Sequence, residues 1–141
     1  MKLDDGHVYI LNDVDDNTGK SDYYKIGMVS KERTVEDRIQ RDHQVGNPRL
    51  IVDIHSFHSE APFFVERHLH KHFAGFRVRR EWFRLTDKQL ADVRKEAADY
   101  DSVIGPMVAD ARAFSLSPSN GNTIQLDATK KTRFQQLNSE L

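Results

Sequence analysis

Two short runs of β-branched and aromatic residues near the start of the chain constrain its fold more than any other feature. The first run covers 7–11 and the second covers 23–29. The segment between them, 12–22, is rich in Asp, Asn, Thr and Gly, which favour turns. Strand-forming runs separated by turn residues are typical of a β-hairpin. The sequence therefore predicts two antiparallel strands joined by a long polar loop.

The next stretch predicts a helix and then a third strand. Thr34 is suited to an N-cap and Asp37 lies three residues after it, a capping pattern that starts a helix at Val35. The turn residues at 46–48 close this helix, and the apolar run that follows predicts a strand over 50–57.

A second helix is predicted after Ser59, whose hydroxyl is suited to a cap. Pro62 is tolerated in its first turn, and Gly75 is a natural stop. Apolar residues recur at every fourth position, which predicts one buried stripe made of Ala61, Val65, Leu69 and Phe73.

The rest of the chain adds a short edge strand over 80–85, a third helix over 88–100 and one more short helix after Gly105-Pro106. From Ser115 onward Ser, Asn, Thr, Gln and Lys dominate, which indicates a tail without a core of its own.

The expected fold class is α/β, with a small and mainly antiparallel sheet of three or four strands flanked by helices. The expected organisation is a domain over 1–86, a helical extension over 87–114 and a polar tail over 115–141.

Composition narrows the function further. A length of 141 residues suits one domain with an extension. The sequence contains no cysteine, so disulfides, thiol catalysis and thiolate metal sites are ruled out. No apolar run approaches the roughly 20 residues of a membrane-spanning helix, and the first residues do not resemble a secretory signal. A cytoplasmic location without membrane association is the default expectation.

The charge of the chain is unevenly distributed. The net charge is −1, but residues 65–84 hold six Arg and Lys against two acids. A polyanion would meet a one-sided basic surface there if these side chains face the same way, and a solvated helix face is the alternative. We predict a DNA-binding surface made of Arg41, His43, Arg67, His70, Lys71, Arg79 and Arg80.

Two tripeptides carry a family resemblance. Val8-Tyr9-Ile10 followed by Lys25-Ile26-Gly27 resembles the paired tripeptides of the GIY-YIG nuclease superfamily. Arg38 lies eleven residues after Gly27, and Glu66 lies on the next predicted helix. The lysine before Ile-Gly and the Glu-Trp-Phe at 81–83 are similar to a branch common in phage and bacterial proteins.

The resemblance implies the roles of four catalytic residues. Tyr9 matches the tyrosine that moves a proton, and Arg38 matches the arginine that contacts the scissile phosphate. Glu66 matches the single glutamate that binds Mg²⁺ or Mn²⁺, which prefer oxygen ligands. Lys25 stands where the superfamily has a tyrosine, and as a lysine of ordinary pKa it is a poor base that could hold a phosphate or a water.

Two positions differ from the superfamily pattern, the tyrosine of the second tripeptide and the histidine of the first helix. Tyr24 is next to Lys25 and must point to the opposite face of the strand, so it cannot replace the missing tyrosine. His43 lies one residue later than the superfamily's helical histidine.

His68 and His72 are one helical turn apart, a spacing that suits two ligands of a zinc ion, but the sequence identifies no third ligand.

The sequence thus favours a metal-dependent endonuclease that hydrolyses DNA phosphodiester bonds. One alternative is a weak or inactive DNA-binding module that kept the fold, because Lys25 replaces the tyrosine. A second alternative is a protein-interaction adaptor whose tail, 115–141, engages a protein partner or a second copy of the chain.

Overall fold

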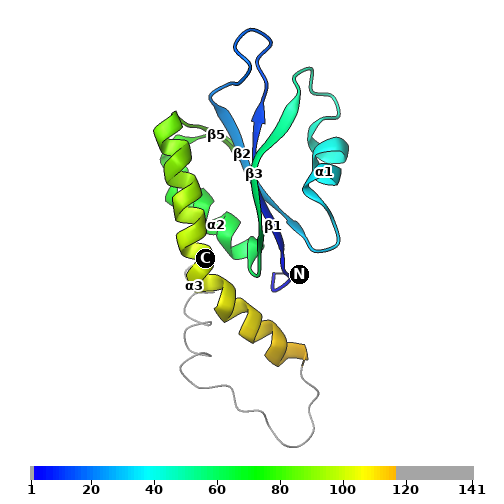
Figure 1. Ribbon diagram of the computed structural model, residues 1–141, viewed down its shortest axis with the longest axis vertical. Coiled ribbons are helices and arrows are strands. Elements are labelled where there is room, and N and C mark those ends of the chain that lie inside the picture. The colour runs from blue at the N-terminus through cyan, green and yellow to red at the C-terminus, as the bar shows by residue number, and fades with distance from the viewer. Residues whose placement is uncertain (1, 117–141) are drawn as a thin grey trace, which may run out of the picture.

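The computed structural model describes residues 2–116 and contains one five-stranded sheet with helices on both faces (Figure 1). The strands are β1 (Gly6–Asp13), β2 (Tyr23–Ser30), β3 (Ile51–Ser59), β4 (Arg77–Arg79) and β5 (Trp82–Arg84). They follow the order β3-β1-β2-β5-β4, and every pairing is antiparallel. The helical segments are α1 (Val35–Arg38), η1 (Ile39–His43), α2 (Pro62–His72), η2 (Ala74–Phe76) and α3 (Asp87–Leu116). The α/β class and the mainly antiparallel sheet are confirmed.

The predicted hairpin forms the centre of the sheet. Strands β1 and β2 pair in a register that places Tyr9 opposite Gly27. Asn12, which is only 2% exposed, closes the long loop because its Nδ2 donates to the carbonyl oxygens of Ser21 and Tyr23, each at 2.9 Å. The buried amide therefore has two backbone acceptors that fix it across the ends of the loop.

Strand β1 is covered on both faces, so its side chains alternate between two clusters. Val8 and Ile10 lie in the larger core with residues of α2 and α3. Tyr9 and Leu11 lie in a smaller cluster with Ile39 of η1. Figure 1 shows α2 and α3 on one side of the sheet and α1 on the other. Tyr9 therefore lies on the face of the sheet that the α1–η1 segment covers.

The two predicted helix starts had different outcomes. The Thr34 cap is confirmed, since its hydroxyl oxygen accepts a hydrogen bond from the Asp37 amide at 3.0 Å. The start of α2 lies later than predicted, with Ala61 at the N-cap position. Ser59 instead turns the chain ahead of the helix, where its hydroxyl accepts from the Ala61 amide at 2.9 Å. The predicted buried stripe of α2 is confirmed.

The sheet has one strand more than predicted. Strand β4 is three residues long and fully exposed, and it pairs with β5 in an irregular register. An exposed Arg-Val-Arg segment carries no apolar alternation, so the sequence pattern could not reveal it.

The C-terminal helical region is one helix and not two. Helix α3 runs from Asp87 to Leu116 and continues through Pro106. A proline removes one backbone hydrogen bond and bends a helix without having to end it. Figure 1 shows that α3 changes direction along its length.

Helix α3 also contributes to the main core. Val93, Ala97, Ile104 and Val108 are fully buried in the same cluster as Val8 and Ile10. The helix over the predicted extension, 87–114, therefore packs on the sheet and α2. The predicted polar tail covers 115–141, and its residues 117–141 lie outside the described residues. Within residues 2–116, none of the helices combines the length and the apolarity that a membrane crossing requires.

Candidate functional site

Tyr9 lies across Gly27 at the centre of the smaller cluster. Its side chain is fully buried. A Cβ atom added at Gly27 would lie 2.3 Å from the Tyr9 hydroxyl oxygen and 2.4 Å from Cζ. Contacts this short are impossible, so the glycine of the second tripeptide makes room for the tyrosine of the first.

The Tyr9 hydroxyl meets His43 on the other side. The hydroxyl oxygen is 3.0 Å from Nε2 of His43, which is the last residue of the π-helical turn η1. The Gln44 amide donates to the Ile39 carbonyl at 2.7 Å, a bond that spans five residues. A π-turn inserts one residue into a helix, and such turns often occur at functional sites. The turn places His43 so that its ring contacts the Tyr9 hydroxyl.

The protonation states of this pair are set mainly by burial. Burial raises the pKa of Tyr9 to about 12, although the Arg38 guanidinium beside it acts to lower that pKa. Burial, together with the charges of Lys25 and Arg38, lowers the pKa of His43 to about 4. At neutral pH the phenol is protonated and the imidazole is neutral. The hydroxyl can therefore donate to Nε2 in the tautomer that has its proton on Nδ1.

Arg38 presents an unsatisfied donor beside this pair. Its Nη1 donates to Asp42 at 2.7 Å. Its Nε is buried and has no hydrogen-bond partner among the described residues. The same side chain lines a surface hollow of about 410 Å³. The Arg38 guanidinium is also a hydrogen-bonding neighbour of the Tyr9 hydroxyl, whose pKa it acts to lower. A buried guanidinium N–H without a partner of good geometry is costly.

Lys25 of β2 lies on the same face of the sheet as Tyr9. The side chain of its neighbour Tyr24 faces the main core on the other side. Tyr24 is 2% exposed in the main cluster, which confirms that it cannot stand in for the missing tyrosine. The Lys25 Nζ is 3.4 Å from the Glu81 carboxylate and 5.7 Å from the centre of the Trp82 ring. Glu81 therefore holds the lysine in place. The sequence did not predict a role for Glu81, because nothing in it shows that the β4–β5 turn approaches β2.

Glu66 is a largely buried carboxyl group on α2 with an exposed side-chain fraction of 20%. Burial, followed by the negative charge of Glu81, raises its pKa to about 7. His70 lies one turn later, with Nε2 3.9 Å from Glu66 and 2.8 Å from the Ile26 carbonyl oxygen of β2. Since that carbonyl can only accept, Nε2 carries a hydrogen, and the ring fixes α2 against the strand.

The acidic groups here suit a hard divalent cation. Glu66 and Glu81 lie close enough for one negative charge to shift the pKa of the other group. Two mutually repelling carboxylates, one of them desolvated, gain when a cation neutralises them, and oxygen is the ligand that Mg²⁺ prefers. The chemistry of Glu66, a largely buried carboxylate ligand, thus fits Mg²⁺ or Mn²⁺.

The seven predicted DNA-binding residues fall into four groups. Arg67, His70 and Lys71 line a hollow of about 460 Å³ together with Glu66 and Arg77. Arg79 and Arg80 are exposed at the β4–β5 turn, directly before Glu81. Arg41 is 77% exposed and pairs with Asp37 at 2.9 Å on the outer side of α1. The hollow thus includes Glu66, whereas Arg41 faces solvent. His43, the remaining predicted residue, is half-buried against Tyr9.

A comparison with family models indicates a nuclease-like or DNA-binding function. The family model described as the T5orf172 domain matches residues 6–98, and the chain belongs to this family. The family is associated with nuclease-type domains of phages. No curated protein and no solved structure shows significant similarity to the chain.

Proposed function

We propose that this protein is a metal-dependent endonuclease that hydrolyses DNA phosphodiester bonds. The observation that carries the proposal is the Tyr9–His43 hydrogen bond beside the unsatisfied Nε of Arg38. A phenol and an imidazole can move a proton and a guanidinium can stabilise negative charge on a phosphate, which supports in-line attack at this site.

Three residues of the chain would bind the phosphate and transfer the proton of the attacking water. Arg38 binds a non-bridging oxygen of the scissile phosphate through its free Nε and orients the phosphorus for attack. Tyr9 accepts a proton from the attacking water while its own proton passes to Nε2 of His43. The new P–O bond then forms as the bond to the leaving sugar oxygen breaks, and that oxygen takes a proton from solvent water. The bound phosphate also raises the pKa of His43, which makes the imidazole a better acceptor.

The acidic and basic groups at the margin complete the site. Mg²⁺ or Mn²⁺ held by Glu66 would polarise the phosphoryl group and stabilise the leaving oxygen. Lys25, held by Glu81, supplies a positive charge on the same face of the sheet as Tyr9. The basic hollow of Arg67, His70 and Lys71, together with Arg79 and Arg80, would hold the flanking phosphates of the DNA.

The test is cleavage of labelled single-stranded, duplex and branched DNA with Mg²⁺ or Mn²⁺. Glu66→Gln should abolish cutting, while Glu36→Gln, an exposed glutamate on α1, should leave it unchanged. Absence of cleavage of every substrate by the wild-type protein would contradict the proposal.

A DNA-binding module without cleavage is the second candidate, favoured by Lys25 at the position of the superfamily's second tyrosine. The lysine is engaged by Glu81 and lies over Trp82, so it is not placed as a free base. This candidate predicts salt-sensitive DNA binding that persists in Glu66→Gln, because phosphate contacts release counterions. Weaker binding after Arg67→Ala and Lys71→Ala, with no product at any metal concentration, would support it.

A further inference from the structure

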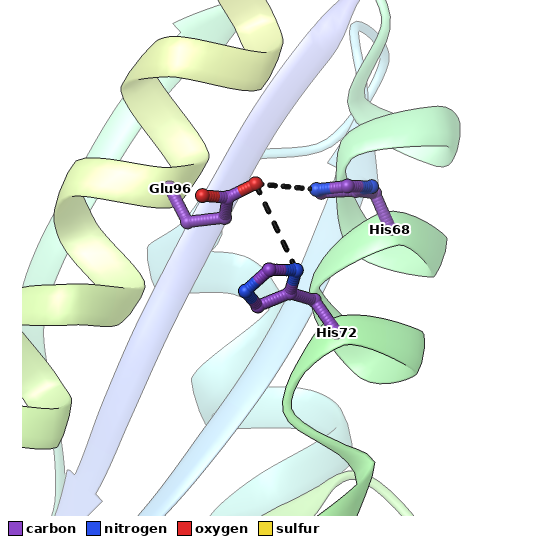
Figure 2. A group of neighbouring side chains, drawn as sticks. All are labelled: His68, His72 and Glu96. Carbon is purple, nitrogen blue, oxygen red and sulfur yellow. Dashed lines mark hydrogen bonds and ion pairs between the residues drawn. The ribbon is translucent and has the colours of Figure 1, made fainter.

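Two histidines of α2 and one glutamate of α3 converge outside the site described above. His68 and His72 occupy successive turns of α2, and Glu96 reaches toward both rings from α3 (Figure 2). One ligand atom from each residue lies within 4.8 Å of the other two. The sequence indicated two ligands at helical spacing, and the packing of α3 on α2 supplies a third.

The distances are close to those of a coordination site. The Glu96 Oε1 atom is 2.8 Å from Nε2 of His68 and 3.9 Å from Nδ1 of His72. In a tetrahedral zinc site with bonds of about 2.0–2.2 Å, neighbouring ligand atoms are separated by roughly 3.4 Å. One distance is slightly shorter than this value and the other slightly longer. Small side-chain rotations would therefore bring all three atoms to one ion.

Neighbouring rings orient the ligand side chains, and one side of the cluster is accessible to an ion from solvent. The His68 ring lies against Tyr100 of α3 with ring centres 3.8 Å apart, and the His72 ring lies 4.8 Å from that of Phe73. The side chains of His68 and Glu96 are 28% and 30% exposed, whereas that of His72 is 50% exposed. An ion can thus enter from the His72 side, where a water can fill a fourth position.

This cluster is distinct from the Glu66 site in position and in chemistry. Glu66 and His70 point toward β2, and His68 and His72 point toward α3, so the two pairs occupy different faces of one helix. Two imidazoles and one carboxylate suit Zn²⁺ and similar transition metals, whereas Mg²⁺ selects sites made of oxygen.

We propose that His68, His72 and Glu96 form a Zn²⁺ site that joins α2 to α3. The ion replaces the direct His68–Glu96 hydrogen bond with three bonds from two helices. Because α2 also carries Glu66, the site would hold the helix of the nuclease-like site against the long C-terminal helix. The proposal stands whether or not the protein cleaves DNA.

The experiment uses the full chain, expressed without a polyhistidine tag and stripped with EDTA. Titration with ZnCl₂ in a calorimeter should show one bound ion that is retained in Glu66→Gln. Saturating Zn²⁺ should raise the melting temperature by roughly 5 °C, while Mg²⁺ should not produce this shift in the Glu66→Gln protein. Added Co²⁺ should give the visible absorption of a tetrahedral complex.

His72→Ala and Glu96→Gln are the decisive variants. His72→Ala removes a half-exposed ring and leaves the His68–Glu96 hydrogen bond in place, so it should fold normally. Both variants should bind Zn²⁺ at least about 100-fold more weakly, since even outer-shell changes cost 10–100-fold. Asp99→Asn is the matched control, because Asp99 lies on α3 and pairs with Lys95 instead. Equal zinc affinity in all these proteins, or none in the wild type, would overturn the proposal.

Discussion

The Tyr9 hydroxyl lies 3.0 Å from Nε2 of His43, a residue that follows it by 34 positions. This contact joins strand β1 to the π-turn on the opposite side of the smaller cluster. It brings a phenol with a pKa of about 12 against an imidazole with a pKa of about 4. With these pKa values, transfer of a proton from the phenol to the imidazole is unfavourable, so the proposed relay requires a bound phosphate to raise the pKa of His43.

Tyr9→Phe should separate this role from a structural one. Loss of the hydroxyl should lower the cleavage rate by about 10²–10⁴-fold, the usual range for a positioned proton-transfer group. The free energy of unfolding should fall by only about 1 kcal/mol, because one hydrogen bond is lost and the ring remains. Single-turnover cleavage and urea denaturation measure the two effects. Tyr23→Phe, at a more exposed position on β2, is the control, and equal rates in both variants would rule out the role of Tyr9.

Glu66 should make the protein less stable as pH rises. Its pKa is raised from 4.5 to about 7 in the folded protein, so folding favours the protonated carboxyl group. The stability that this group contributes is present below pH 4.5 and is lost as pH rises through about 7. Relative to Glu66→Gln, the wild type should lose at most about 3 kcal/mol across this window. Urea denaturation of both proteins at about pH 5 and about pH 8 measures the difference.

The comparison between the two proteins matters because His43 acts in the opposite direction. Its pKa is lowered from 6.5 to about 4, so its contribution is present above pH 6.5 and is lost as pH falls. Both proteins share this effect, and it cancels in the difference. Parallel pH profiles for the wild type and Glu66→Gln would show that Glu66 ionises normally.

Gly27→Ala should disturb the Tyr9–His43 pair. The added methyl group would overlap the Tyr9 ring, which is fully buried and cannot move into solvent. We expect a loss of about 1–3 kcal/mol in unfolding free energy, as for other overpacked cores, together with reduced cleavage. Gly75→Ala is the matched control, because a Cβ there meets nothing within 4 Å and the backbone is unstrained. Equal stability of the two variants would contradict the close approach.

Arg112→Ala should test how α3 is attached to the domain. Arg112 donates to the carbonyl oxygens of Leu3 at 2.8 Å and Glu60 at 3.0 Å, and it pairs with the Glu60 carboxylate. Losing these partners should cost about 2–3 kcal/mol, measured by urea denaturation. Lys88→Ala, an exposed change in the first turn of α3, should be nearly neutral. If both variants matched the wild type, the second half of α3 would contribute nothing to the stability of the fold.

The sequence alone determined the elements that depend on local chemistry. The β-branched and aromatic runs at 7–11 and 23–29 and the turn residues between them predicted the hairpin, and the spacing from Ala61 to Phe73 predicted the buried face of α2. Thr34 and Asp37 predicted a helix start because a cap involves only near neighbours. Local patterns were weaker at Ser59 and Pro106, where tertiary packing overrode the expected cap and the expected break.

Only the tertiary structure decided which side chains meet. The hydrogen bond of Tyr9 to His43 depends on a π-turn, and the effect of Glu81 on Lys25 and Glu66 depends on where the β4–β5 turn lies. The third ligand of the histidine pair comes from Glu96, 24 residues after His72 in the sequence. Side-chain periodicity shows which face of an element is buried, but it carries no information about which distant segment covers that face. The chemistry of both proposed sites therefore arises from contacts between elements.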